Sequence, residues 1–215
     1  MAQENWNDMT GNKNDPANKS REKNIKNARA EIARSTQPGN DRQVRQYAAL
    51  LLGQLGDPEG IDPLIQALRD PDIKVRAQAA EALGKIGSPA VDSLALLMDD
   101  PDWKVRYRAA EALGITGSKN AVPFLITALG DPKDHVRYMA AKSMGATGSG
   151  DAEVALLARL GDENEFVRRS AATALGKTGG PATKKALIQS LSSETSDTVR
   201  EALESARNLL EKRGM

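Results

Sequence analysis

The chain has 215 residues, of which 40% are hydrophobic and only 3% aromatic, with 30 basic and 29 acidic residues and no cysteine. This length and apolar content suffice for a packed core, and the absence of cysteine excludes disulfides, thiolate catalysis and cysteine-ligated metals. The net charge of +1 argues against a dedicated nucleic-acid binder, which usually carries a basic excess.

Residues 1–20 are rich in Asn, Asp, Lys and Gly and contain almost nothing apolar, which predicts a disordered polar tail. Trp6 is the exception, and it is either a docking residue or incidental. The tail has no apolar segment typical of a secretory signal, and nothing in the chain approaches the ~18 consecutive apolar residues of a membrane span. We therefore expect a cytoplasmic protein without a membrane segment.

Residues 21–40 predict a capping helix and a linker ahead of the repeats. Ile25, Ala28 and Ile32 form a weak apolar stripe at helical spacing. The segment 35–40, which contains a proline and a glycine, then breaks the helix.

A repeat fills residues 41–215. The dipeptide Val-Arg occurs at 44/45, 75/76, 105/106, 136/137, 167/168 and 199/200, in steps of 31, 30, 31, 31 and 32 residues. The copy from Asp70 to Asp99 begins with apolar residues three and four apart: Val75, Ala79, Ala82, Leu83 and Ile86. A second apolar pattern follows: Val91, Leu94, Leu97 and Met98. Each pattern predicts a helix of about ten to fifteen residues that needs its neighbours to bury its stripe.

Each copy carries the same signals for the ends of its first helix. Three aspartates are predicted N-caps, each followed by a proline at the first helical position: Asp70-Pro71, Asp100-Pro101 and Asp131-Pro132. Four glycines are predicted to end the helix in the left-handed conformation: Gly87, Gly117, Gly148 and Gly179. Glycines one turn earlier predict close approach of neighbouring helices: Gly53, Gly84, Gly114, Gly145 and Gly176.

The segment DPDIKVRAQAAEALGKIG, from Asp70 to Gly87, and its copies resemble the HEAT-like repeats of phycobilin lyases, deoxyhypusine hydroxylase and many small archaeal and bacterial proteins. The resemblance covers residues 41 to about 212 and implies an all-α, armadillo-like solenoid. We expect a right-handed α-α superhelix of about five to six helix pairs. The last pattern places Val199, Leu203 and Leu210 on one face and charges on the others, as a terminal cap should, so we expect a monomer.

The resemblance implies a structural role for the repeated arginines: Arg45, Arg76, Arg106, Arg137, Arg168 and Arg200. In HEAT-like repeats such an arginine pairs with an acidic residue of a neighbouring helix turn and joins one repeat to the next. The planar guanidinium suits this bidentate task better than lysine would. The alternative is a basic ladder for phosphates.

No catalytic or metal site is evident. Gly176-Lys177-Thr178 resembles the end of a phosphate-binding loop, but position 171 is alanine where that motif needs glycine. His135 is the only histidine, so neither a histidine-rich metal site nor a catalytic triad is expected. The iron site of deoxyhypusine hydroxylase needs His-Glu pairs, and this chain has none. We expect no cofactor and no enzymatic activity.

The resemblance also implies that the Val-Arg helices line the concave face of the solenoid. Their outward positions hold all three tyrosines of the chain, together with Met, Arg and other residue types enriched at protein interfaces. The predicted binding ridge consists of Tyr47, Gln78, Glu81, Trp103, Lys104, Tyr107, Arg108, Glu111, His135, Tyr138, Met139, Lys142, Phe166 and Arg169. The alternative is that some of these rings merely cover neighbouring helices.

These observations favour a non-enzymatic scaffold that binds a protein or peptide on the ridge. One alternative, a phycobilin-lyase-like chaperone or lyase acting on a tetrapyrrole-bearing protein, follows from the resemblance alone. Another is nucleic-acid binding in the concave groove, as in HEAT-like alkylpurine DNA glycosylases. Cations beside stacking rings favour it, namely Lys104, Arg108, Lys142 and Arg169. Glu81 and Glu111 oppose it.

Overall fold

The computed structural model describes Lys26, Ala30 and residues 33–214, and all regular structure among them is helical. The tail predicted over residues 1–20, with Trp6, lies outside the described residues. Most of the predicted capping helix lies outside them too, although Lys26, Ala30 and residues 33–35 are helical.

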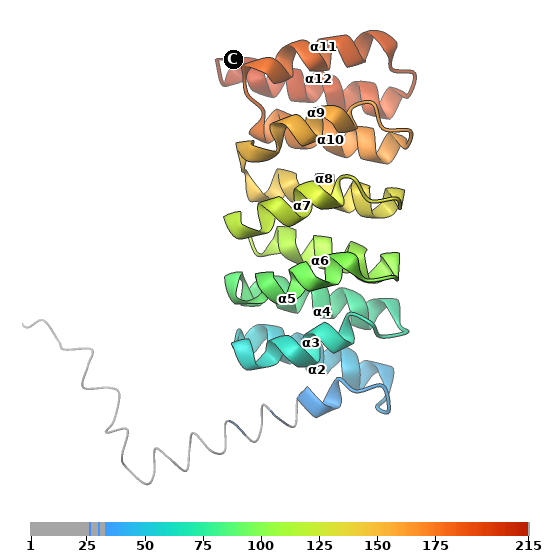
Figure 1. The fold of residues 1–215 in the computed structure, drawn as a ribbon, viewed down its shortest axis with the longest axis vertical. Coiled ribbons are helices and arrows are strands. Elements are labelled where there is room, and N and C mark those ends of the chain that lie inside the picture. The colour runs from blue at the N-terminus through green and yellow to red at the C-terminus, as the bar shows by residue number, and fades with distance from the viewer. Residues whose placement is uncertain (1–25, 27–29, 31–32, 215) are drawn as a thin grey trace, which may run out of the picture.

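The helices follow one another as pairs stacked into one elongated array (Figure 1). The helices with the Val-Arg dipeptide are α2 (Arg42–Leu55), α4 (Ile73–Ile86), α6 (Trp103–Ile115), α8 (Asp134–Thr147), α10 (Glu165–Thr178) and α12 (Asp197–Lys212). The second helices of the pairs are α3 (Ile61–Ala67), α5 (Val91–Leu96), α7 (Val122–Ala128), α9 (Glu153–Arg159) and α11 (Pro181–Ser193). The predicted all-α fold of sequential helix pairs is confirmed.

Most second helices are shorter than the repeat predicts. α5 has six residues, and α3, α7 and α9 have seven each. Short 3-10 segments flank them: η2 (Pro58–Gly60), η3 (Ser88–Ala90), η4 (Leu97–Asp99), η5 (Lys119–Ala121) and η6 (Gly150–Ala152). Buried Ala90 and Leu97 lie in such segments on either side of α5. The apolar pattern therefore identifies the buried residues without distinguishing α-helical from 3-10 turns.

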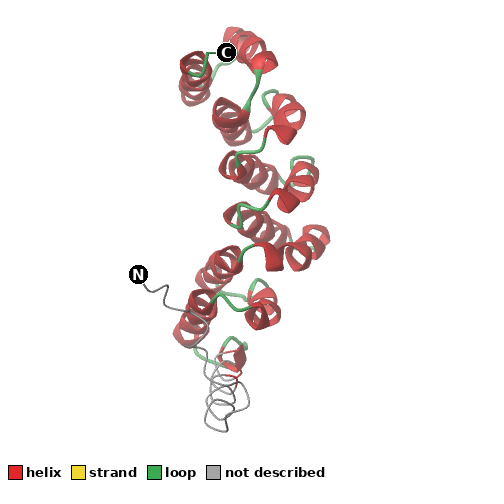
Figure 2. Ribbon diagram, turned by 90° about the vertical axis from the view of Figure 1, so that its left-hand side faces the viewer, coloured by secondary structure: helices red, strands yellow, loops and turns green. Residues whose placement is uncertain are grey.

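The Val-Arg helices form one layer of the stack and the second helices form the other. Seen from the side, the stack bends, and the Val-Arg layer lies on the inner side of the bend (Figure 2). Small and aliphatic side chains fill the space between the layers, and one leucine of each second helix is fully buried: Leu64, Leu94, Leu125, Leu156 and Leu187. This core is continuous, so each pair depends on its neighbours for burial.

The Val-Arg helices begin later than predicted. Asp72 and Asp102 are N-caps of α4 and α6, and each carboxylate accepts a hydrogen bond from the backbone N–H two residues on, at 2.8 and 2.9 Å. The predicted caps instead lie in the preceding turn with the prolines that follow them: Asp70, Asp100 and Asp131. The N-cap prediction was wrong because the carboxylates of these earlier aspartates bind arginines of the preceding repeat: Arg45, Arg69 and Arg106.

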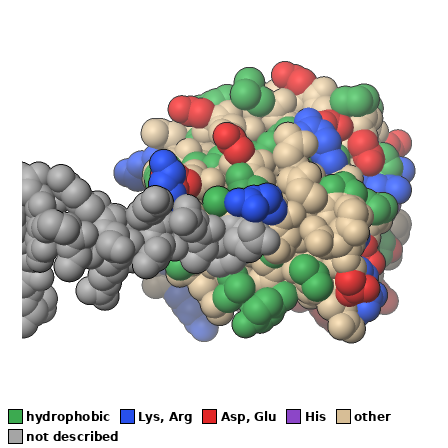
Figure 3. All heavy atoms as spheres, turned by 90° about the horizontal axis from the view of Figure 1, so that it is seen from below, with side chains coloured by type: hydrophobic (Ala, Val, Ile, Leu, Met, Phe, Trp, Pro, Cys, Tyr) green, Lys and Arg blue, Asp and Glu red, His purple; other side chains and the backbone are tan. Residues whose placement is uncertain are grey.

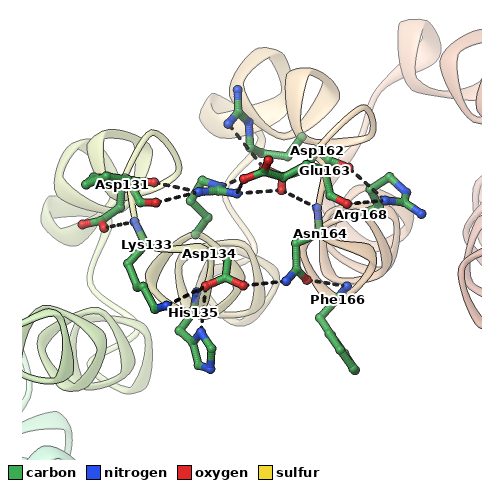
Figure 4. A network of polar contacts seen from close by, with 12 residues as sticks. Asp131, Lys133, Asp134, His135, Asp162, Glu163, Asn164, Phe166 and Arg168 are labelled. Carbon is green, nitrogen blue, oxygen red and sulfur yellow. Dashed lines mark hydrogen bonds and ion pairs between the residues drawn. The ribbon is translucent and has the colours of Figure 1, made fainter.

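A buried ion pair links successive repeats. Arg137 is 6% exposed, and its Nε and Nη2 donate hydrogen bonds to the two carboxylate oxygens of Asp162 at 2.8 and 2.9 Å (Figure 4). Its Nη1 donates to the backbone carbonyl of Asp131 at 3.0 Å. The same bidentate arrangement joins Arg45 to Asp70, Arg106 to Asp131 and Arg168 to Glu194. We call these four pairs the arginine ladder.

Glycines let consecutive Val-Arg helices cross closely, as predicted. A Cβ on Gly53 would lie 2.7 Å from the Cα of Ala82 in α4, and one on Gly176 would lie 2.8 Å from the Cα of Ala206 in α12. A larger residue in either slot would push two backbones apart.

Two of the predicted left-handed glycines have a different conformation. Gly148 is left-handed with φ 67° and ψ 8°, whereas Gly87 has φ 83° but ψ −142°, and Gly179 has φ −68° and an extended backbone. The connection explains the conformation of Gly179, because α11 begins at Pro181 without the 3-10 segment that precedes the other second helices.

We expect Gly53→Ala to destabilise the chain by about 1–3 kcal/mol, although alanine is the better helix former, because the added Cβ would collide with α4. Urea denaturation followed by circular dichroism measures this. Gly161→Ala is the control, since a Cβ there meets nothing within 4 Å. An unchanged free energy of unfolding for Gly53→Ala would contradict the close crossing.

The arginine ladder predicts acid sensitivity. Hydrogen bonds from Arg168 lower the pKa of Glu194 to about 2 in the folded chain, against an unfolded value of 4.5. A depressed folded pKa adds stability above the unfolded value, and this stability is lost as the pH falls from about 4.5 toward about 2. We expect Glu194→Gln to lower the melting temperature at neutral pH and to converge with the wild type in acid.

Glu204→Gln provides the matched control, because Glu204 is exposed on α12. Equal melting temperatures for both variants at neutral pH would show that the ladder pair adds no stability.

Candidate binding groove on the Val-Arg layer

The first turns of four Val-Arg helices bound two adjoining hollows. The larger, of about 290 Å³, is lined by Ile73, Arg76, Trp103, Lys104, Tyr107, Arg108, His135 and Tyr138. The smaller, of about 170 Å³, is lined by Asp134, His135, Tyr138, Asn164 and Phe166. His135 and Tyr138 belong to both, so the hollows form one surface that crosses α4, α6, α8 and α10. We call this surface the concave groove.

Aromatic rings from neighbouring helices meet in the middle of the concave groove. The ring centroids of Trp103 and His135 are 4.9 Å apart, and the Lys133 ammonium lies 5.5 Å from the Trp103 ring. Tyr107 and Tyr138 are half-buried and pack against the core, and burial raises the pKa of Tyr107. The two tyrosines therefore cover neighbouring helices and line the groove at the same time.

Asp134 joins His135 to Asn164, the N-cap residue of α10, at the far end of the groove. Its Oδ1 accepts a hydrogen bond from the His135 backbone N–H and lies 2.8 Å from the His135 Nδ1, while its Oδ2 accepts one from Asn164 at 2.6 Å. The bond to the His135 side chain lowers the pKa of Asp134 to about 2. The rings of His135 and Phe166 point to the same side, away from Asp162 and Arg168 of the ladder (Figure 4).

Three acidic groups of the groove helices already lie beside cations. Glu81 forms an ion pair with Lys85 at 2.6 Å, and Glu111 pairs with Arg108. Asp134 lies 3.6 Å from the Lys133 ammonium. These three carboxylates are therefore largely neutralised, whereas Glu165 of α10 is exposed and accepts a hydrogen bond from the Ser196 hydroxyl.

Several cations of the same helices have no such partner. Among the residues that the structure describes, no carboxylate forms an ion pair with three lysines of the groove helices: Lys74, Lys104 and Lys142. The Arg169 guanidinium lies 5.4 Å from the Phe166 ring. The concave groove thus combines aromatic surface with an excess of positive charge.

The predicted ridge residues fall into three groups. Seven line the concave groove: Trp103, Lys104, Tyr107, Arg108, His135, Tyr138 and Phe166. Six lie outside the two hollows, on α2 or on the groove helices: Tyr47, Gln78, Glu81, Glu111, Lys142 and Arg169. Met139 is 2% exposed and part of the core, so its placement on the ridge was wrong. The corresponding position in α6 holds Arg108, which reaches the groove, whereas the unbranched apolar side chain of Met139 packs into the core.

Four groove residues were missed as ridge residues: Ile73, Arg76, Asp134 and Asn164. Ile73 is 61% exposed and stands two residues before its valine, as Trp103 does. Comparison of that slot between repeats would have found it. Arg76 was predicted to pair with an acidic residue, but within the described part of the chain neither Arg76 nor Arg200 forms such an ion pair. Arg200 donates to the backbone carbonyls of Leu191 and Glu194 instead.

Other surfaces carry scattered apolar side chains. Leu96, Val154 and Ile188 on the second helices are 79%, 80% and 50% exposed, but each stands at a different position relative to the buried leucine of its helix. At the end formed by α2 and α3, hydrophobic side chains stand between acidic and basic ones (Figure 3). The described residues include no cluster of three metal-ligating side chains and no helix long and apolar enough to cross a membrane.

Comparison with known proteins identifies relatives of this fold. The family model for HEAT repeats matches residues 30–95, 91–160 and 147–207. Human deoxyhypusine hydroxylase is 28% identical with a TM-score of 0.51, and the match covers 86% of this chain and 74% of that one. A search of curated proteins gave no match.

Two further structures are similar at the level of fold. The complex of CpcE and CpcF of phycocyanin lyase from Nostoc is 24% identical with a TM-score of 0.64, over 70% of this chain and 99% of that one. A designed armadillo repeat protein in complex with the peptide (KR)4 is 20% identical with a TM-score of 0.54, over 83% and 98%.

The burial of Met139 predicts that Met139→Ala destabilises the chain by about 2–5 kcal/mol, because it leaves a cavity in the core. Urea denaturation followed by circular dichroism checks this. Lys142→Ala, an exposed position on the same helix, is the control and should change stability by less than about 0.5 kcal/mol. Similar changes in the free energy of unfolding for the two variants would contradict the burial of Met139.

Proposed function

This chain belongs to the HEAT repeat family, and we propose that it is a non-enzymatic scaffold that binds an extended segment of a partner protein along the concave groove. The supporting observation is the meeting of exposed and half-buried rings from three consecutive Val-Arg helices, α6, α8 and α10, on one surface. Aromatic side chains and arginine dominate the binding energy of protein interfaces when they cluster in this way.

The shape of the groove favours an extended segment over a folded domain as the partner. Each of the four groove helices contributes a ring or an aliphatic side chain at its start, so the anchors recur with the repeat along this part of the stack. The hollows, of about 290 and 170 Å³, have room for single side chains. The designed armadillo protein, which shares this fold, is in complex with a peptide.

We prefer a protein to a nucleic acid as the partner. Phosphate binding usually relies on a large basic excess, and this chain has 30 basic and 29 acidic residues. The ion pair with Glu111 already neutralises the Arg108 side chain, which would otherwise be available to a phosphate. Rings with a few cations suit a peptide better.

The experiment is affinity capture from the native cell extract with three forms of the chain. Lys104→Ala combined with Phe166→Ala changes the groove, and both side chains are exposed. Lys185→Ala combined with Ile188→Ala is the matched control on α11, because Ile188 and Phe166 are both 50% exposed. We expect a protein that the wild type and the control retain and the groove variant loses, while circular dichroism remains unchanged.

Equal recovery by all three forms, or loss from the α11 variant alone, would place the binding surface elsewhere. Recovery of nucleic acid in place of protein would contradict the proposed partner class.

A further inference from the structure

Arg76 occupies the position that the ladder arginines have in their helices, but it binds no carboxylate of residues 33–214. Its Nη1 donates hydrogen bonds to the backbone carbonyls of Asp70 and Pro71 at 2.6 and 2.8 Å, as the Nη1 of Arg106 does to Asp100 and Pro101. Its Nε is buried and has no hydrogen-bond partner among the described residues. In the four ladder pairs, this Nε and the neighbouring Nη2 bind the two oxygens of a carboxylate.

A shorter repeat accompanies the missing partner, and another arginine binds the carboxylate that would fill the place. Arg45 and Asp70 are 25 residues apart in sequence (70 minus 45), and Arg106 and Arg137 have the same distance to their aspartates. Between Arg76 and Asp100 the distance is only 24 residues (100 minus 76). Asp100 instead accepts hydrogen bonds from the Nε and Nη2 of Arg69, at 3.1 and 2.7 Å.

Arg76 also lines the larger hollow of the concave groove, together with Lys104 and the rings of Trp103 and Tyr107. The Arg76 guanidinium forms no ion pair with a described carboxylate, although its charge lowers the pKa of Asp70, and it stands beside the exposed Lys104. Such a guanidinium favours a carboxylate ligand, because charge-assisted hydrogen bonds to Arg are the strong ones. The four ladder pairs show that arginine in this position binds a carboxylate through Nε and Nη2.

We propose that the partner segment is acidic and that Arg76 binds one of its carboxylates in the larger hollow. An apolar side chain beside that carboxylate packs on Trp103 and Tyr107, and Lys104 meets a second acidic group. This inference rests on the proposed function and adds the chemistry of the partner. The expected sign of charge is opposite to that of the (KR)4 peptide held by the designed armadillo protein.

Fluorescence anisotropy with short labelled peptides tests the inference on the full chain. The probe is a peptide in which Glu and Asp alternate with Trp and Leu, and its comparisons are the same peptide with Lys and Arg in place of the acids and a single-stranded oligothymidylate. We expect the acidic peptide to bind more tightly than either, and salt to weaken its binding.

Arg76→Gln should weaken binding of the acidic peptide about tenfold or more, the usual effect of losing a charge-assisted hydrogen bond. Arg200→Gln is the matched control, because Arg200 also bonds only to backbone carbonyls and lies away from the groove. Lys104→Gln should weaken binding as well, and because Lys104 is exposed it tests the same hollow without altering Arg76.

The inference is overturned if the acidic peptide does not bind, if Arg76→Gln binds it as well as Arg200→Gln does, or if the basic peptide or the oligothymidylate binds more tightly. Such results would leave the proposed scaffold function standing as long as the groove variant still loses its captured partner. If the groove variant captured the same partner as the wild type, in contrast, the scaffold function itself would be contradicted.

Discussion

The arginine ladder is the interaction on which the geometry of this solenoid depends. A buried ion pair is weak evidence for stability, because desolvation offsets much of the attraction, but removal of one partner leaves a buried charge at a cost of about 3–5 kcal/mol. The bidentate pair of Arg137 with Asp162 therefore acts mainly by fixing position. It joins the start of one Val-Arg helix to the turn before the next, and so it sets the spacing at which the groove side chains meet.

The sequence predicted the features that every repeat encodes in the same way, namely the buried core and the close helix crossings. The apolar stripe located the core, and the recurring glycines located the helix crossings, because both depend on contacts that every copy makes in the same way. Helix starts were less predictable. The turn at Asp70 and Asp72 offers two capping carboxylates, and the choice between them is made by Arg45, which lies 25 residues earlier.

The candidate groove was predictable in outline and not in detail. Outward slots on the Val-Arg helices pointed to Trp103, Tyr107 and Phe166, which do lie on one surface. Met139 occupies such an outward position but is buried, because an apolar side chain at the edge of the apolar stripe packs inward. The shorter spacing from Arg76 to Asp100 is visible in the sequence, but its meaning depends on which carboxylate each arginine binds, and that is a property of the assembled stack.

The missing carboxylate of Arg76 goes with one residue fewer between Arg76 and Asp100, and with the binding of Asp100 by Arg69. One inserted residue between Arg76 and Asp100 would restore the spacing of the other repeats and allow the chain to neutralise this arginine from within. In a tandem array, insertions and deletions in turns can therefore create or remove an anion-binding position while every helix keeps its sequence. Repeat proteins of this kind have a route to new specificity through turn length, which leaves the packed layers untouched.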